Sequence, residues 1–204
     1  MRVIATVALL TCAICSVSSA QTARPNNATV TPANPSNVAQ SAAKSPKQAE
    51  SISAEASDMF LGLVQEINHR PERNAVEVNG KGLGWKETTK EMNAMLNAKR
   101  GFVGKLAGQV VFLGSDGTND IFSIAVEKNF DSVAIHDRIK NVVNMKVVGS
   151  NTSMGQKTDM YRIFDGTKDL GLLSMTYGVA EAIRGTGTIG YISSARAKRE
   201  GIIR

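Results

Sequence analysis

The spacing of apolar residues predicts a long amphipathic helix at the start of the folded region. Apolar side chains recur at three- and four-residue spacing and form one stripe, which consists of Ile52, Ala56, Met59, Phe60, Leu63, Val64 and Ile67. Ser45 and Pro46 suit the cap and first turn of this helix, and residues 68–71 are expected to end it. The stripe is interpreted as core packing rather than as a membrane or partner surface.

A short strand and a second helix are predicted next. Residues 75–78 are expected to form the strand, and the glycine-rich segment 79–85 a turn. Thr88 and Glu91 have the spacing of a capping box, so they predict a helix that ends at Gly101.

From there the pattern changes to apolar runs rich in β-branched residues, which predict strands. The predicted strands cover residues 103–113, 121–126, 132–135, 145–149, 160–164 and 170–176, with a short helical piece over 137–144. Asp116-Gly117 predicts a hairpin turn. Residues 178–204 are ambiguous, and we expect loop and short helix there.

The order of these elements predicts an α+β fold, with N-terminal helices followed by a small, strongly curved antiparallel sheet. The alternation over residues 105–113 and the segment Val147-Val148-Gly149 resemble the barrel strands of the oligonucleotide/oligosaccharide-binding (OB) fold. This resemblance of pattern implies an OB-like barrel. An open antiparallel sheet packed on the two helices explains the sequence almost as well.

Composition divides the chain into three parts. Residues 1–20 carry one cation, an apolar run and small residues before Gln21, which is typical of a cleaved signal peptide. Residues 21–44 are rich in Pro, Ala, Asn and Ser and predict a disordered linker. Residues 45–204 are expected to form a single α+β domain. Cys12 and Cys15 lie in the predicted signal, so the mature chain would be an exported protein, periplasmic or secreted, without thiols.

The formal net charge of +6 weakly favours an anionic partner. The candidate binding residues are the basic side chains near the end of the chain, namely Arg184, Arg196, Lys198, Arg199 and Arg204. A solvated basic tail is the competing interpretation. Nucleic acid is an improbable partner because aromatic residues make up only 5% of the chain, and Phe112, Phe122, Tyr161 and Phe164 fall on predicted core strands.

Four short motifs suggest chemistry, and each has a simpler interpretation. Asp116-Gly117-Thr118-Asn119-Asp120 and Asp165-Gly166-Thr167-Lys168-Asp169 could hold a hard cation, but both are read as hairpin turns. The segment 185–190 matches Gly-x-Gly-x-x-Gly, yet a helix is expected before it rather than a strand, so a flexible turn is predicted. Ser41-x-x-Lys44 lies in the predicted linker without the partner motifs of penicillin-recognising enzymes.

His69 and His136 are the two candidate bases at neutral pH, and both are read as structural. His136 and Asp137 are expected to point to opposite faces of a strand. The sequence predicts no metal site, no cofactor and no transmembrane span in the mature chain. We therefore expect an exported, non-enzymatic binding or cell-envelope assembly protein that recognises an envelope protein or an anionic surface or ligand. The alternatives are an exported hydrolase that uses His136, or an exported binder of anions, oligosaccharides or nucleic acid.

Overall fold

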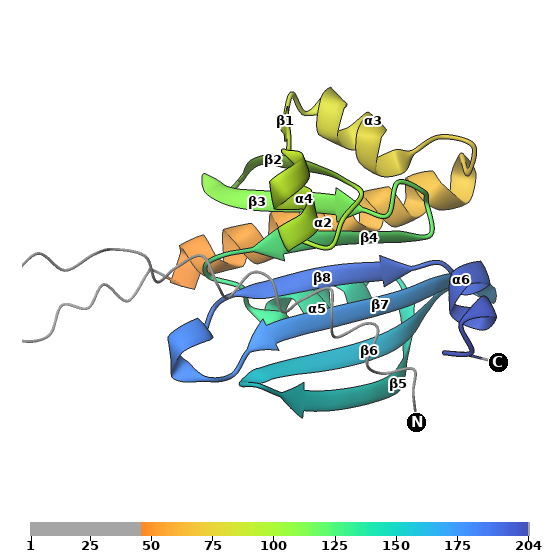
Figure 1. Cartoon of the computed structure of the whole chain (residues 1–204). Helices are drawn as coiled ribbons and strands as arrows, with labels where there is room; N and C mark the ends of the chain where they lie inside the picture. Colours follow the sequence, from red (N-terminus) through yellow and green to blue (C-terminus); the bar gives the residue numbers. More distant parts are fainter. Residues whose placement is uncertain (1–45, 204) are drawn as a thin grey trace, which may run out of the picture.

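One large antiparallel sheet dominates the computed structural model, which describes residues 46–203 (Figure 1). The predicted signal peptide, the predicted linker, Ser45 and Arg204 lie outside the described residues. The sheet has eight strands in the order β1-β2-β3-β4-β8-β7-β6-β5. Their bounds are β1 Lys86–Glu87, β2 Arg100–Leu106, β3 Gln109–Ser115, β4 Ile121–Val126, β5 Asn144–Ser153, β6 Gln156–Asp165, β7 Lys168–Gly178 and β8 Gly187–Ile192.

Strand β8 joins two meanders into this single sheet. Strands β1 to β4 follow one another in space, and helix α5 (Ser132–Lys140) then carries the chain to the far edge, where β5 begins. Strands β5, β6 and β7 return towards the centre, and β8 pairs with β7 on one side and with β4 on the other. The centre of the sheet is therefore completed by its last strand in chain order.

The main core lies between the sheet and the long helix α2 (Pro46–His69), which packs beside α5. The side chains at alternate positions of β4 and β8 point towards this helix, so Phe122 and Tyr191 are buried beneath Phe60. The rings of Phe60 and Phe122 are 5.7 Å apart and those of Phe122 and Tyr191 are 5.0 Å apart. The Tyr191 hydroxyl donates to the Leu170 carbonyl at 2.7 Å, which satisfies a polar group within the core.

The opposite face of the sheet carries two short helices, α4 (Lys90–Met95) and α6 (Ser194–Arg199). Helix α6 covers a small second cluster of buried side chains formed by Leu172, Ile192 and Ala197. Two further helical segments complete the described part, α3 (Ala75–Gly82) and the short 3-10 helix η2 (Glu181–Ile183). None of the described helices is long and apolar enough to span a membrane.

The predicted small, strongly curved sheet or OB-like barrel is wrong. The sheet is open, is not strongly curled, and ends in two edge strands, β1 and β5. Strand β8 explains the error, because residues 178–204 were expected to form loop and short helix, whereas β8 occupies the centre of the sheet. The open antiparallel sheet packed on helices, which the sequence also allowed, is the architecture observed.

Three local predictions fail for identifiable reasons. Residues 75–78 begin helix α3 rather than a strand, because the Asn74 side chain accepts a hydrogen bond from the Glu77 amide and caps the helix. The predicted strand 103–113 is a hairpin, because Ala107 and Gly108 both have positive φ and turn the chain between β2 and β3. Residues 132–135 belong to helix α5, which Asp131 caps.

The remaining elements confirm the periodic reading. Helix α2 matches the predicted amphipathic helix, and β4, β5, β6 and β7 contain the strands predicted over residues 121–176. The second predicted helix is observed as α4, but it ends at Met95 rather than at Gly101, which lies in β2. Thr89 rather than Thr88 caps it, accepting from the Met92 amide at 3.3 Å.

Candidate functional site

A groove lies on the face of the sheet opposite α2, over the central strands β4, β8 and β7. It encloses ≈ 310 Å³ and is lined by side chains from the sheet, from the α4–β2 connection and from α6. Ala98 lies on one side, over Gly114, and Arg196 and Glu200 lie on the other. We call this site the central groove.

Hydroxyl groups from three different strands form the floor of the central groove. Ser123 on β4 pairs with Gly190 on β8, which pairs with Ser174 on β7, so the three residues form one row across the sheet. Thr188 occupies the adjacent row beside Thr176. Within residues 46–203, the Ser123, Ser174 and Thr188 hydroxyls have no hydrogen-bond partner, whereas Thr176 bonds to Thr158 at 2.8 Å.

Small residues keep this floor open. A Cβ atom added at Gly190 would lie 2.4 Å from the Ser174 Oγ, so any larger residue there would displace this hydroxyl. A Cβ added at Gly114 would lie 3.2 Å from the Ala98 Cβ. The glycines therefore allow close approach to the backbone at the centre of the sheet.

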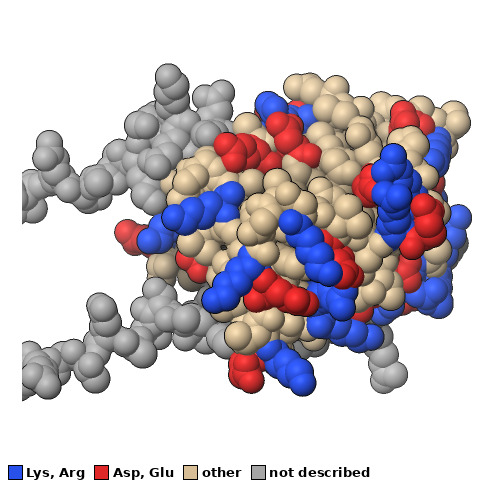
Figure 2. All heavy atoms as spheres, turned by 90° about the horizontal axis from the view of Figure 1, so that it is seen from above, with Lys and Arg blue, Asp and Glu red and all other residues tan. Residues whose placement is uncertain are grey.

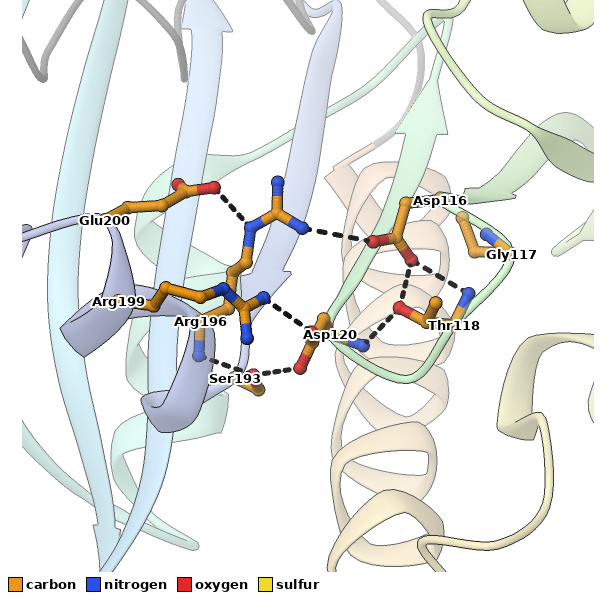
Figure 3. Close-up of polar contacts among 9 residues, drawn as sticks. Asp116, Gly117, Thr118, Asp120, Ser193, Arg196, Arg199 and Glu200 are labelled. Carbon is orange, nitrogen blue, oxygen red and sulfur yellow. Dashed lines mark hydrogen bonds and ion pairs between the residues drawn. The ribbon is translucent and has the colours of Figure 1, made fainter.

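A network of charged and hydroxyl side chains forms one end of the groove and holds α6 against the β3–β4 loop (Figure 3). Asp120 accepts hydrogen bonds from the Ser193 hydroxyl at 2.5 Å and from Arg199 at 3.1 Å. The Ser193 hydroxyl, followed by the Arg199 guanidinium, holds the pKa of the Asp120 carboxyl below its usual value, although partial burial acts in the opposite direction. Ser193 also caps α6 by accepting from the Arg196 amide at 3.1 Å.

Arg196 lies between two carboxylates in the same network. Its guanidinium bonds to Glu200 and lies 3.8 Å from Asp116. Figure 3 shows it between these two carboxylates. The hydrogen bond to Glu200 raises the pKa of Arg196. Asp116 also accepts from the Thr118 amide and hydroxyl at 2.9 and 2.6 Å, which folds the loop back on itself.

The predicted basic binding residues do not form one surface. Arg196 and Arg199 pair with carboxylates, and Arg184 lies just before β8, at the opposite end of that strand from α6. Lys198 lies on α6 and is exposed, while Arg204 lies outside the described residues. The basic tail therefore serves in part to attach α6 to the sheet, a role that the sequence did not indicate.

The positive and negative charges of the described residues are closer to balance than the net charge of the whole chain suggests. All 18 acidic residues lie within the described part, whereas Arg2, Arg24, Lys44 and Arg204 are among the 24 basic residues and lie outside it. In Figure 2, Lys and Arg side chains alternate with Asp and Glu over the face that is shown. That face offers no broad surface of one sign for a polyanion.

The two Asp-Gly-Thr segments form hairpin turns, as predicted, between β3 and β4 and between β6 and β7. The described residues contain no group of three His, Cys, Asp or Glu side chains that could hold a metal ion. In the second turn, Asp169 accepts a hydrogen bond from Arg162 at 2.6 Å. Arginine side chains thus face the carboxylates that end both motifs.

The Gly-x-Gly-x-x-Gly segment is not the flexible turn expected from the sequence. Gly187 to Gly190 lie within β8, with Gly187 against the ring of Phe130 and Gly190 beside Ser174 on the neighbouring strand. The glycines therefore serve close packing at the centre of the sheet rather than phosphate binding at a helix N-terminus.

The histidines lie away from the central groove. The His69 ring nitrogen Nδ1 lies 2.9 Å from the Gln65 carbonyl at the end of α2. The His136 Nδ1 lies 3.0 Å from Asp137 Oδ1, and its ring packs on Tyr161. The prediction that His136 and Asp137 point apart is wrong because both are on a helix, α5, rather than a strand.

Of the aromatic residues expected in the core, Phe122 is buried there and Phe164 is not. Phe122 is buried beneath α2. Phe164 is only half-buried and lies between Lys146 and Arg162, whose cationic groups are 5.2 and 5.4 Å from its ring centroid. These contacts are cation–π interactions near the edge of the sheet.

A second polar cluster surrounds the buried carboxylate of Asp159, on the face of the sheet towards α5. Hydrogen bonds from Ser150 at 2.6 Å and Tyr177 at 2.8 Å, together with Lys157 at 3.2 Å, satisfy it. Burial acts to raise its pKa, but these partners outweigh burial and lower the pKa. The cluster therefore stabilises an ionised carboxylate and leaves none of its oxygens without a partner.

Comparison with known proteins gives no relative: no protein family, curated protein or solved structure matches the chain.

Proposed function

We propose that the protein is an exported, non-enzymatic binding protein that holds its ligand in the central groove. The observation that carries this proposal is the row of hydroxyl groups on the groove floor. The hydroxyl groups of Ser123, Ser174 and Thr188 make no hydrogen bond within residues 46–203, so a bound molecule could use all three.

The dimensions and lining of the groove support the proposal. Small-molecule sites are usually concave, mostly apolar and largely preformed, with a few polar groups and volumes of about 300–1,000 Å³. The central groove encloses ≈ 310 Å³, and Ile121, Ile192 and Ala98 add apolar surface to its hydroxyl floor. The paired β-strands fix the positions of the hydroxyl groups, Ile121 and Ile192 before any ligand binds.

The residues that line the groove favour binding over hydrolysis. The base that most often activates a serine nucleophile is an adjacent histidine. None of the described residues that line the groove is a histidine or a cysteine. His136 lies on α5, which packs beside α2 on the other face of the sheet, so it is separated from Ser123 and Ser174 by the sheet itself.

The predicted signal peptide and the predicted linker suggest where the protein would bind its ligand. A chain with residues 1–20 removed and residues 21–44 as a spacer would present the domain in the periplasm or outside the cell. A spacer of this length could extend over roughly 80 Å. Such a tether suits either capture of a ligand or assembly of the cell envelope.

A ligand screen by protein-detected NMR tests the proposal. The library consists of sugars, amino acids, short peptides and organic acids, and binding is followed at the amide signals of Ser123, Ser174 and Gly190. We expect at least one compound to shift these signals and to be recovered unchanged after incubation. Ser123→Leu, which fills the floor, should abolish the shifts, whereas Thr152→Leu on the exposed edge strand β5 should retain them.

Two results would contradict the proposal. One is a library in which no compound shifts the groove signals. The other is a ligand whose affinity survives Ser123→Leu unchanged. Turnover of a bound compound that is lost in His136→Ala with the fold intact would instead support the hydrolase.

A further inference from the structure

The charged residues at the central groove allow its ligand to be narrowed to one chemical class. Four side chains that are charged at neutral pH line the groove: Lys99, Asp116, Arg196 and Glu200. Three of them interact with one another, because Arg196 bonds to Glu200 and lies 3.8 Å from Asp116. Within residues 46–203, the Lys99 side chain makes no ion pair or hydrogen bond, so its positive charge is not compensated.

The backbone of Lys99 lies next to the floor of the groove. Ala98, the preceding residue, lies over Gly114, and Gly114 is the strand neighbour of Ser123. The Lys99 amide donates to the Ser115 carbonyl at 2.8 Å, which fixes the backbone at this end of the groove. The aliphatic part of Lys99 lies beside Gly117 in the β3–β4 loop.

We infer that the ligand of the central groove is a small organic anion with one negative group. This inference rests on the proposed function and deepens it. The negative group pairs with Lys99, and the rest of the molecule accepts or donates hydrogen bonds at Ser123, Ser174 and Thr188. A carboxylate suits this arrangement because its two oxygens can accept from a lysine and a hydroxyl at the same time.

The same charges set an upper limit on the ligand's charge. Asp116 and Glu200 border the groove, and their shared partner Arg196 leaves this group of three with a net negative charge. A polyphosphate or another multiply charged anion would be repelled by these carboxylates. Lys99 can balance one negative charge, which favours a monoanion.

The test uses matched pairs of probes that differ only in charge. Hexanoate and hexanamide form one pair, benzoate and benzamide a second, and gluconate and gluconamide a third. NMR titration follows the amide signals of Ser123, Ser174 and Gly190. We expect at least one carboxylate to bind in the groove and its amide to bind more weakly by about two- to fivefold, the range for an ion pair that remains partly exposed.

Variants at Lys99 assign this difference to one side chain. Lys99→Gln should weaken carboxylate binding by about two- to fivefold and leave amide binding unchanged. Lys99→Arg should keep the preference for the carboxylate. Lys168→Gln, at an exposed lysine in the β6–β7 hairpin, removes the same charge away from the groove and should have no effect.

The outcomes separate this inference from the proposed function. Equal affinity of each acid and its amide, with no effect of Lys99→Gln, would overturn the inference while leaving a binding groove. Groove binding only by uncharged compounds from the wider library would overturn it as well. If no compound of any charge binds in the groove, the proposed function itself fails.

Discussion

The attachment of α6 to the sheet depends on Asp120, so Asp120→Ala should destabilise the protein measurably. The Asp120 side chain is 30% exposed and accepts hydrogen bonds from Ser193 and Arg199. Its backbone carbonyl also accepts from the Ser193 amide at 2.8 Å, and this bond is kept in the variant. The substitution thus removes the side-chain contacts and preserves the main-chain contact.

The magnitude follows from the two lost interactions. A hydrogen bond to a charged group contributes about 1.5–3 kcal/mol, and partial exposure places the Ser193 bond at the lower end of this range. The ion pair with Arg199 contributes less than about 1 kcal/mol, because the Arg199 side chain is 60% exposed. We therefore expect the free energy of unfolding to fall by about 2 kcal/mol.

Acid should remove the same contribution from the unmodified protein. The pKa of Asp120 is lower in the folded than in the unfolded state, so its stabilising effect is present above the unfolded value and is lost as the pH falls towards the folded value. The difference in stability between the unmodified protein and Asp120→Ala should therefore narrow below about pH 4.

Urea denaturation at pH 7 and at pH 3 measures both effects. A loss of about 2 kcal/mol lowers the midpoint by about 1 M when the urea dependence is about 2 kcal/mol per M. Asp165→Ala is the matched control, because Asp165 is exposed in the β6–β7 turn and its side chain makes no hydrogen bond or ion pair within residues 46–203. Equal midpoints for the two variants, or a difference that does not change with pH, would refute this account of the network.

Two further substitutions test the packing of the sheet. Gly104→Ala would place a Cβ atom 2.2 Å from the ring of Trp85, so we expect the free energy of unfolding to fall by about 1–3 kcal/mol. The fluorescence of Trp85, the single tryptophan of the chain, should shift as well. Gly62→Ala on α2 is the control, because its added Cβ meets nothing within 4 Å and should not destabilise the protein. Tyr191→Phe leaves the Leu170 carbonyl without its hydroxyl donor and should cost about 1–2 kcal/mol in thermal unfolding. Burial raises the pKa of Tyr191 to about 12, so the stability difference between the unmodified protein and Tyr191→Phe should decrease as the pH rises above about 10. A stability difference that grows with pH would contradict this reasoning.

Elements with regular apolar spacing could be predicted from the sequence. Helix α2 carries a continuous apolar stripe, and β4 and β7 are dense in β-branched and apolar residues, so local pattern was sufficient for them. Strand β8 was missed because Gly187, Thr188 and Gly190 read as a turn. In the folded protein these small residues accommodate Phe130 and Ser174 from neighbouring elements, which is a tertiary requirement.

The candidate site could not be predicted because its parts are far apart in the sequence. Ser123, Ser174 and Thr188 belong to three strands and meet only through the pairing register of the sheet. Each is a common residue in a strand, and none has a local motif. The ion pairs of α6 show the same limit, since Arg196 and Asp116 were identified separately but not as partners.

The central position of β8 has a consequence for how the chain can reach its native state. Strands β4 and β7 both leave a full row of backbone groups unpaired until β8, which follows them in the chain, is inserted between them. During synthesis, the preceding segments would therefore expose two unpaired strand edges until β8 is available. Folding should be slow and strongly cooperative, because contacts between distant parts of the chain must form together. A chaperone that covers the unpaired edges of β4 and β7 until residues 187–192 become available would help a chain of this topology to fold.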